Sequence, residues 1–165
     1  MKMEMNELVE RYKDNLFAAA FQICKNRADA DDVVQDTFLQ YYLADKQFET
    51  EEHIKAWLLR VAINRAKDVS RTFWKRNQMP LEDYMTGLSF EAEEEGELFE
   101  TVMGLPEKYR IVIHLFYYED YSVREIADVL KLSESNVKVR LSRGRKLLKK
   151  YLTGEGESKK KIHFV

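Results

Sequence analysis

Hydrophobic residues recur every three or four positions along most of the chain, the spacing of one face of an α-helix. The clearest example runs from near Asn6 to Lys25. Six of its apolar residues share one face: Leu8, Tyr12, Leu16, Ala19, Ala20 and Ile23. No segment alternates apolar and polar residues clearly enough to indicate a strand, and only two prolines interrupt the chain. The pattern predicts an all-α protein of about seven helices.

Two more helices are predicted in the first half of the chain. One runs from near Asp29 to about Leu43, with acidic residues at its amino end, where the helix dipole favours negative charge. The next runs from about Glu52 to Lys75. Its predicted buried residues are Ile54, Trp57, Leu58, Val61, Ala62 and Val69. Together the three helices are predicted to form a first domain, residues 1–76.

Residues 77–96 break the helical pattern. They are acidic, contain Pro80 and two glycines, and are too polar to pack as a helix, so we predict a flexible linker. Helical spacing returns at Glu97, and Pro106 opens a further helix. Residues 97–153 are predicted to form a four-helix second domain. A tail of residues 154–165 follows, to which we assign no function.

A helix-turn-helix is indicated between Tyr121 and Lys150. Ser122 and Glu125 have the spacing of a capping box, and Ser133 can cap a second helix. The outward residues of that second helix suit phosphates and base edges in a major groove: Lys138, Ser142, Arg143, Arg145, Lys146 and Lys149. The alternative is a solvated amphipathic hairpin. The turn has Lys131 where glycine would most easily take a positive φ.

The net charge of -2 conceals a strong segregation of charge. Seven basic residues and one acid lie between Lys55 and Arg76, and eight basic residues and one acid lie between Lys131 and Lys150. Between these two segments, residues 77–107 hold nine acids and no base. Local patches set the field that a DNA backbone experiences, so the composition is compatible with nucleic-acid binding.

Catalytic and metal chemistry find no support in the sequence. The three histidines, His53, His114 and His163, are scattered without ligand spacing, and there is no phosphate-binding glycine loop. The single cysteine, Cys24, lies in an apolar helical run and is predicted to be buried and inert. Because these motifs are missing, we expect a protein that is not an enzyme and uses no cofactor. We also expect it to be cytoplasmic, because the sequence shows no signal segment or membrane span.

Four motifs, in this order along the chain, resemble those of the two-domain extracytoplasmic-function (ECF) group of sigma-70 RNA polymerase sigma factors. They are DADDVVQDTFLQYY (29–42), FETEEHIKAWLLRVAINRAKDVSR (48–71), GLPEKYRIVIHLFYYEDYS (104–122) and the helix-turn-helix. The resemblance implies a three-helix region 2 domain and a four-helix region 4 domain. Such a protein binds core polymerase, melts the minus-10 promoter element and reads the minus-35 element.

The first motif resembles the surface that docks on the clamp helices of the polymerase's largest subunit. The residues that match this surface are Asp32, Gln35, Asp36, Phe38 and Leu39. An acidic helix that meets a basic coiled coil gains orientation and association rate from complementary charge. The alternative is that its acidic residues only stabilise the amino end of the helix by their interaction with the helix dipole, and the two roles are compatible.

Members of the family capture an exposed minus-10 base between a loop, here Phe48–His53, and the following helix. Asn64 matches the position that contacts the flipped base, and an amide can both donate to and accept from a base edge. The resemblance implies this minus-10 set: Phe48, His53, Arg60, Asn64, Arg65, Lys67 and Arg71. The loop is also acidic, and its glutamates would repel phosphates unless they point away or select particular bases.

For the minus-35 element, the resemblance implies that the second helix of the helix-turn-helix enters the major groove. Lys138, Val139, Ser142 and Arg143 match positions that face base edges. Ser133, Arg140 and Arg145 match positions that face phosphates.

The implied partners are core RNA polymerase, through its clamp helices and flap region, promoter DNA, and an anti-sigma factor that could hold the protein at a membrane; no small-molecule substrate is implied. One alternative is a stand-alone helix-turn-helix regulator, and another is a protein that sequesters other factors.

Overall fold

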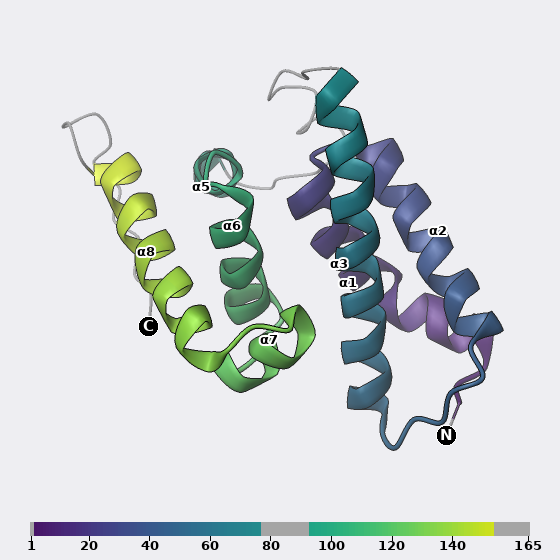
Figure 1. Ribbon diagram of the computed structural model, residues 1–165. Coiled ribbons are helices and arrows are strands. Elements are labelled where there is room, and N and C mark those ends of the chain that lie inside the picture. Colours follow the sequence, from purple (N-terminus) through teal and green to yellow (C-terminus); the bar gives the residue numbers. More distant parts are fainter. Residues whose placement is uncertain (1, 77–92, 154–165) are drawn as a thin grey trace. The chain divides into compact units, whose positions relative to one another are not determined.

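The computed structural model describes residues 2–76 and 93–153, and Figure 1 shows their arrangement. All regular structure in these residues is helical, which confirms the predicted fold class. The chain forms two compact units, Met1–Gly87 and Leu88–Val165. Most of the predicted linker and the whole predicted tail lie outside the described residues. Within the described ranges, no helix is both long and apolar enough to cross a membrane.

Three helices make up the described part of the first unit: α1 (Met5–Cys24), α2 (Arg27–Leu43) and α3 (Glu51–Arg76). Each packs against the other two (Figure 1). Lys25 ends α1 in the left-handed conformation with a φ of 54°. The side chain of Asn26 then caps α2 by accepting from the Asp29 backbone N–H at 2.8 Å.

The buried faces of these helices follow the sequence pattern in α1 and depart from it in α3. All six residues predicted for the buried face of α1 are buried. The buried apolar residues of α3 are Ile54, Leu58, Leu59, Ala62, Ile63 and Ala66. Trp57, Val61 and Val69, which we had predicted to be buried, are only partly buried. The covered side is rotated from the predicted one toward Leu59, Ile63 and Ala66, because the positions of α1 and α2, and not the spacing within α3, determine which side is covered.

The second unit contains α5 (Glu93–Met103), α6 (Glu107–Ile113), the π-helical turn η1 (His114–Tyr118), α7 (Val123–Leu130) and α8 (Glu134–Thr153). Helix α5 begins four residues before the predicted start at Glu97, so residues 93–96 belong to a helix and not to the linker. Glutamate is a favourable helix residue, and three of these four residues are glutamates. Pro106 stands at the N-cap of α6 and not inside its first turn.

The helix-turn-helix is built as predicted from α7 and α8. Ser122 Oγ accepts from the Glu125 N–H at 3.1 Å, and the Glu125 carboxylate accepts from the Ser122 N–H at 2.9 Å, which completes the capping box. Lys131 makes the turn with a φ of 56°. Ser133 Oγ accepts from the Asn136 N–H at 3.1 Å at the start of α8.

Helix α8 crosses α6 closely at Gly144. A Cβ atom at this position would lie 2.8 Å from Ile113 Cδ1 and 3.2 Å from Tyr109 Cβ. The Ile113 side chain can shift, but Tyr109 Cβ is fixed to the backbone of α6. A side chain here would have to displace Ile113 and press on Tyr109, so the present distance between the two helices favours glycine.

We expect Gly144→Ala to lower the free energy of unfolding by about 1–2 kcal/mol, because overpacking outweighs the gain in helix propensity. Thermal unfolding followed by circular dichroism would measure this. Ser142→Ala, an exposed change on the same helix, is the matched control and should leave the midpoint nearly unchanged. A raised midpoint for Gly144→Ala would contradict the close-approach explanation.

His114 is a buried titratable residue of η1. It is 7% exposed, its ring stacks on that of Tyr118 at a centroid distance of 4.7 Å, and its Nε2 has no hydrogen-bond partner among the described residues. Burial lowers the pKa of His114 to about 4. The imidazole is therefore neutral in the folded protein at pH 7.

This lowered pKa predicts a loss of stability in acid. As the pH falls, the unfolded histidine takes up a proton near pH 6.5 and the folded form only at a lower pH. Above about pH 6.5 both forms are neutral, so the protonation of His114 does not reduce the free energy of unfolding. The free energy of unfolding should fall by about 1.4 kcal/mol per pH unit as the pH drops from about 6.5 toward 4. Urea unfolding at pH 7 and pH 5 would measure the difference. His114→Gln should reduce the difference, and an unchanged pH dependence in that variant would contradict the assignment.

Candidate nucleic-acid interface

The outer face of α2 carries the residues predicted to dock on the polymerase. Asp32, Gln35 and Leu39 are exposed, and Asp36 is partly exposed. Phe38 is only 7% exposed, so most of its side chain supports this surface from within, and its predicted role as a contact stays a prediction. Its position is fixed by packing between α1 and α2.

The sequence prediction missed two exposed apolar residues at the carboxyl end of α2. Tyr42 is 65% exposed and Leu43 is 69% exposed, beside Leu39 at 55%. Residues three and four positions apart lie on the same side of a helix, so these side chains extend the surface that begins with the acids of α2. The spacing from Leu39 was the available signal in the sequence.

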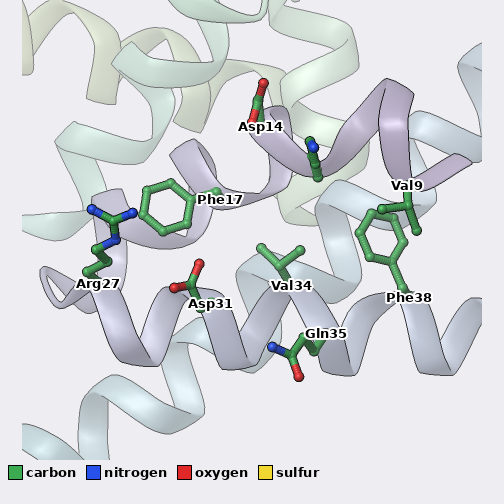
Figure 2. A pocket seen from close by; sticks show the side chains of 9 residues that line it. Val9, Asp14, Phe17, Arg27, Asp31, Val34, Gln35 and Phe38 are labelled. Atoms are coloured by element: carbon green, nitrogen blue, oxygen red, sulfur yellow. The ribbon is translucent and has the colours of Figure 1, made fainter. Parts of the chain in front are cut away.

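A groove of about 400 Å³ runs between α1 and α2, and Figure 2 shows the side chains that line it. Its lining combines apolar side chains with two charges of each sign: Val9, Lys13, Asp14, Phe17, Arg27, Asp31, Val34, Gln35 and Phe38. Gln35 and Phe38 therefore belong both to this groove and to the predicted polymerase surface. Nearby, burial and the Asp32 carboxylate raise the pKa of Asp29 above its ordinary value.

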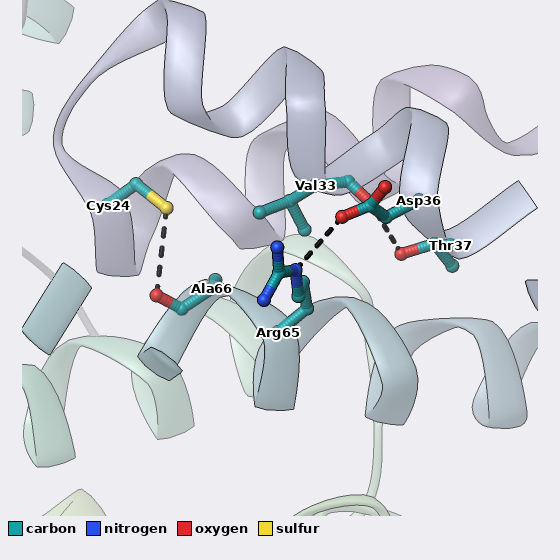
Figure 3. A network of polar contacts seen from close by, with 6 residues as sticks. All are labelled: Cys24, Val33, Asp36, Thr37, Arg65 and Ala66. Carbon is teal, nitrogen blue, oxygen red and sulfur yellow. Dashed lines mark hydrogen bonds and ion pairs between the residues drawn. The ribbon is translucent and has the colours of Figure 1, made fainter. Parts of the chain in front are cut away.

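An ion pair connects α2 to α3 (Figure 3). Arg65 Nε lies 2.9 Å from Asp36 Oδ2, and the two side chains are 45% and 43% exposed. Pairs this exposed typically contribute about 0–1 kcal/mol to stability. The pair brings together one residue predicted to bind polymerase and one predicted to bind DNA. Figure 3 also shows Cys24 Sγ beside the Ala66 carbonyl at 3.8 Å, in agreement with the prediction that Cys24 is buried.

The remaining predicted minus-10 residues of α3 differ in exposure. Asn64 is exposed, and Arg60 and Lys67 are partly exposed. Arg71 is exposed and pairs with Asp68 at 3.2 Å. The helix thus presents an amide and several cations to solvent, some of them already paired within the protein.

The loop before α3 contains the clearest departure from the predicted minus-10 set. Phe48 is 2% exposed, stacks on Tyr41 at a centroid distance of 5.6 Å, and meets the Trp57 ring edge-on at 5.6 Å. Its side chain is part of the core and cannot contact DNA from this position. The partly exposed Trp57 ring completes the cluster, in keeping with the packing role that its helical face suggested.

His53, at the start of α3, is partly exposed. Its Nδ1 accepts from the Glu49 backbone N–H at 3.3 Å, which requires an unprotonated Nδ1. The hydrogen-bond pattern therefore assigns the proton of the neutral ring to Nε2, where it can be donated to a ligand.

The acidic loop is partly neutralised within the protein. Glu51 forms an ion pair with Arg11 of α1, so this carboxylate is held against the domain. Glu49 and Glu52 remain exposed. The repulsion of phosphates expected from the sequence is therefore reduced at one of the three glutamates.

On α8, four of the predicted minus-35 residues form an exposed row: Lys138, Val139, Ser142 and Arg143. Their spacing of one and four residues places them on one stripe of the helix. Ser133 caps the helix, and Arg140 Nε donates to Asn136 Oδ1 at 3.0 Å. This arrangement can present two cations and a hydroxyl to the floor of a groove.

Arg145, predicted to contact a phosphate, is partly exposed and also contacts η1, and its predicted role stays a prediction. Its Nε donates to the Tyr117 hydroxyl at 2.8 Å, and its guanidinium lies 5.2 Å from the Phe116 ring centroid and 5.6 Å from that of Tyr117. These contacts tie α8 to η1. No local sequence signal indicates them, because Arg145 and Tyr117 are 28 residues apart.

Comparisons with known proteins match both units. A family model described as Sigma-70 region 2 matches residues 8–78, and one described as Sigma-70, region 4 matches residues 95–148. The ECF RNA polymerase sigma factor SigW of Bacillus subtilis is 29% identical over 165 residues, which cover 88% of this chain and 87% of SigW. The ECF RNA polymerase sigma-E factor of Haemophilus influenzae is 29% identical, and the match covers 89% of this chain and 86% of that protein.

Two solved structures are similar over most of the chain. CnrH, in complex with the cytosolic domain of CnrY, has a TM-score of 0.66 and 30% identity, covering 92% of this chain and 88% of CnrH. The sigma factor RpoE, in complex with the anti-sigma factor NepR from Bartonella quintana, has a TM-score of 0.71 and 21% identity, covering 91% of this chain and 97% of RpoE. At that identity, the second likeness concerns the fold alone.

The contact between Arg145 and Tyr117 predicts energetic coupling between α8 and η1. We expect Arg145→Met and Tyr117→Phe each to lower stability, with a coupling energy of about 0.5–1.5 kcal/mol in a double-mutant cycle. Denaturant unfolding of the four proteins would measure it. Arg143→Met is the control, since Arg143 lies on the exposed row of α8, and it should be additive with Tyr117→Phe. Additivity in the Arg145 cycle would contradict the tie.

Proposed function

Because the chain belongs to the ECF group of sigma-70 RNA polymerase sigma factors, which act in transcription initiation, we propose a division of that work between its two units. The first unit binds core polymerase and opens the minus-10 element, and the second reads the minus-35 element. The observation that supports this most directly is that the two family models fall in different compact units, in the order region 2 and then region 4. A stand-alone helix-turn-helix regulator would have no need of the region 2 unit.

The proposed domains are residues 1–76 for region 2, 77–92 for the connection and 93–153 for region 4, which moves the predicted boundary at 96/97 to the start of α5. The proposed core-binding surface is the outer face of α2: Asp32, Gln35, Asp36, Leu39, Tyr42 and Leu43. Its acids supply charge that a basic partner can complement, and its apolar carboxyl end supplies area to bury.

The proposed minus-10 surface combines the start and the middle of α3. His53 and Asn64 offer polar groups for a single-stranded base, and Arg60, Arg65, Lys67 and Arg71 offer charge to the phosphates. The proposed minus-35 surface is the exposed row on α8, with Ser133 and Arg140 nearer the phosphates. Arg143 is the residue best suited to a bidentate contact with guanine.

An anti-sigma factor is a further proposed partner. RpoE, which shares this fold, was solved with the anti-sigma factor NepR, and CnrH was solved with the cytosolic domain of CnrY. The α2 face would be a suitable target, because covering it would also block the proposed docking on polymerase.

The test is run-off transcription on a library of genomic fragments with purified core polymerase. The wild-type protein should produce discrete start sites preceded by two spaced elements. Arg143→Ala should retain core binding and lose about 1–3 kcal/mol of discrimination at one minus-35 base pair. A uniform loss across sequences would instead assign Arg143 to a phosphate.

Asp36→Arg should weaken core binding, measured by fluorescence anisotropy with labelled protein. This change also breaks the pair with Arg65, so Arg65→Ala is the matched control: it breaks the same pair and leaves the Asp36 carboxylate in place. Arg65→Ala should retain core binding. If both variants lost core binding equally, the ion pair itself and not the acidic surface would be responsible.

A further inference from the structure

The residues that precede α1 pack across the carboxyl end of α2. The Met3 backbone N–H donates to the Tyr41 hydroxyl at 2.8 Å, and the Met3 side chain is 8% exposed. Lys2 Nζ donates to the Ala44 carbonyl at 2.6 Å and lies 5.2 Å from the Tyr41 ring centroid. Ala44 is the C-cap of α2, where a cation satisfies a free carbonyl and complements the helix dipole. We refer to Lys2–Glu4 as the N-terminal arm.

Tyr41 connects this arm to the loop before α3. Its side chain is fully buried, and one side of its ring stacks on Phe48 at 5.6 Å. Phe48 in turn contacts the His53 ring at 5.2 Å and the Trp57 ring at 5.6 Å. A continuous series of contacts therefore runs from the arm through Tyr41 and Phe48 to His53.

The loop depends on few attachments to the core. Of residues 45–50, only Phe48 is buried, and the other five are exposed. Phe48 seats the loop against Tyr41, Lys2 contacts the Ala44 carbonyl at its base, and the Glu49 and Thr50 hydrogen bonds to His53 join its far end to α3. A shift of the Tyr41 ring would be transmitted to Phe48, because buried rings in contact have little free space between them.

We propose that Lys2, Met3 and Tyr41 are positioning residues for promoter opening. They hold the loop and His53 in the geometry that receives an unpaired base of the minus-10 strand, without contacting the DNA themselves. This inference rests on the proposed function of the loop and α3. It assigns a task to an arm that carries none of the predicted site residues.

The arm also explains why Tyr41 carries a hydroxyl. The ring alone would suffice to stack on Phe48, and a buried hydroxyl requires a hydrogen-bond partner. The Met3 N–H is such a partner, so the hydroxyl fixes the arm and the ring relative to each other. Tyr41→Phe removes this bond and preserves the ring.

The experiment compares wild-type protein with Tyr41→Phe and Lys2→Met, each as the full chain with core polymerase. Promoters recovered by the wild-type protein are prepared with single-base substitutions across the minus-10 and minus-35 elements. Permanganate reactivity of unpaired thymines measures opening, and run-off transcription measures base preference. We expect both variants to lose roughly 2- to 10-fold in opening and in minus-10 discrimination, the scale of one hydrogen bond, with unchanged core affinity and minus-35 discrimination.

Conservative and unrelated changes serve as controls. Lys2→Arg keeps the charge and a donor and should restore most of the minus-10 discrimination that Lys2→Met loses. Tyr151→Phe removes a hydroxyl from the exposed end of α8 and should behave as wild type.

The outcomes separate this inference from the proposed function. If wild-type protein does not distinguish minus-10 substitutions, the proposed function fails. If wild type distinguishes them and Tyr41→Phe and Lys2→Met do so equally well, the positioning role alone is overturned. A parallel loss of thermal stability, core affinity and activity on every promoter would show a purely structural arm and would also overturn the proposal.

Discussion

Each helix of this protein must bury a wide apolar face, and the side that remains exposed determines which groups can meet a partner. The effect is clear in α3, which packs against α1 and α2. With Leu58, Ala62 and Ala66 fully buried, the opposite side of the helix is left to Asn64, Lys67 and Arg71. Burial therefore places the polar and cationic groups on one surface without any need for a specific contact to hold them there.

Most of the architecture could be predicted from the sequence, because it depends on local signals. The 3.6-residue spacing gave the buried face of α1, and the pair Ser122 and Glu125 gave the start of α7. Lys131 could be expected at the turn, and it adopts the left-handed conformation in place of the more usual glycine. These features involve residues within a few positions of one another.

The site residues that differed from expectation depend on contacts between distant parts of the chain. Phe48 is buried by the rings of Tyr41 and Trp57, and Arg145 is held by Tyr117, so neither position can be read from local spacing. The π-helical turn at His114–Tyr118 was also not predicted, since five residues are too few for a change in hydrophobic spacing to be recognised. The count of basic residues between Lys55 and Arg76 did not include pairing within the protein. Pairs such as Arg71 with Asp68 reduce the positive field that a partner meets.

The pair between Asp36 and Arg65 has a consequence for how such a protein can evolve. One partner lies on the acidic face of α2 and the other on the cationic face of α3, so a substitution at either position changes the electrostatic surroundings of both faces. A lineage that replaces one of the two residues leaves the other charge without this partner, so a compensating change can follow at the second position, although 29 positions separate the two in the chain.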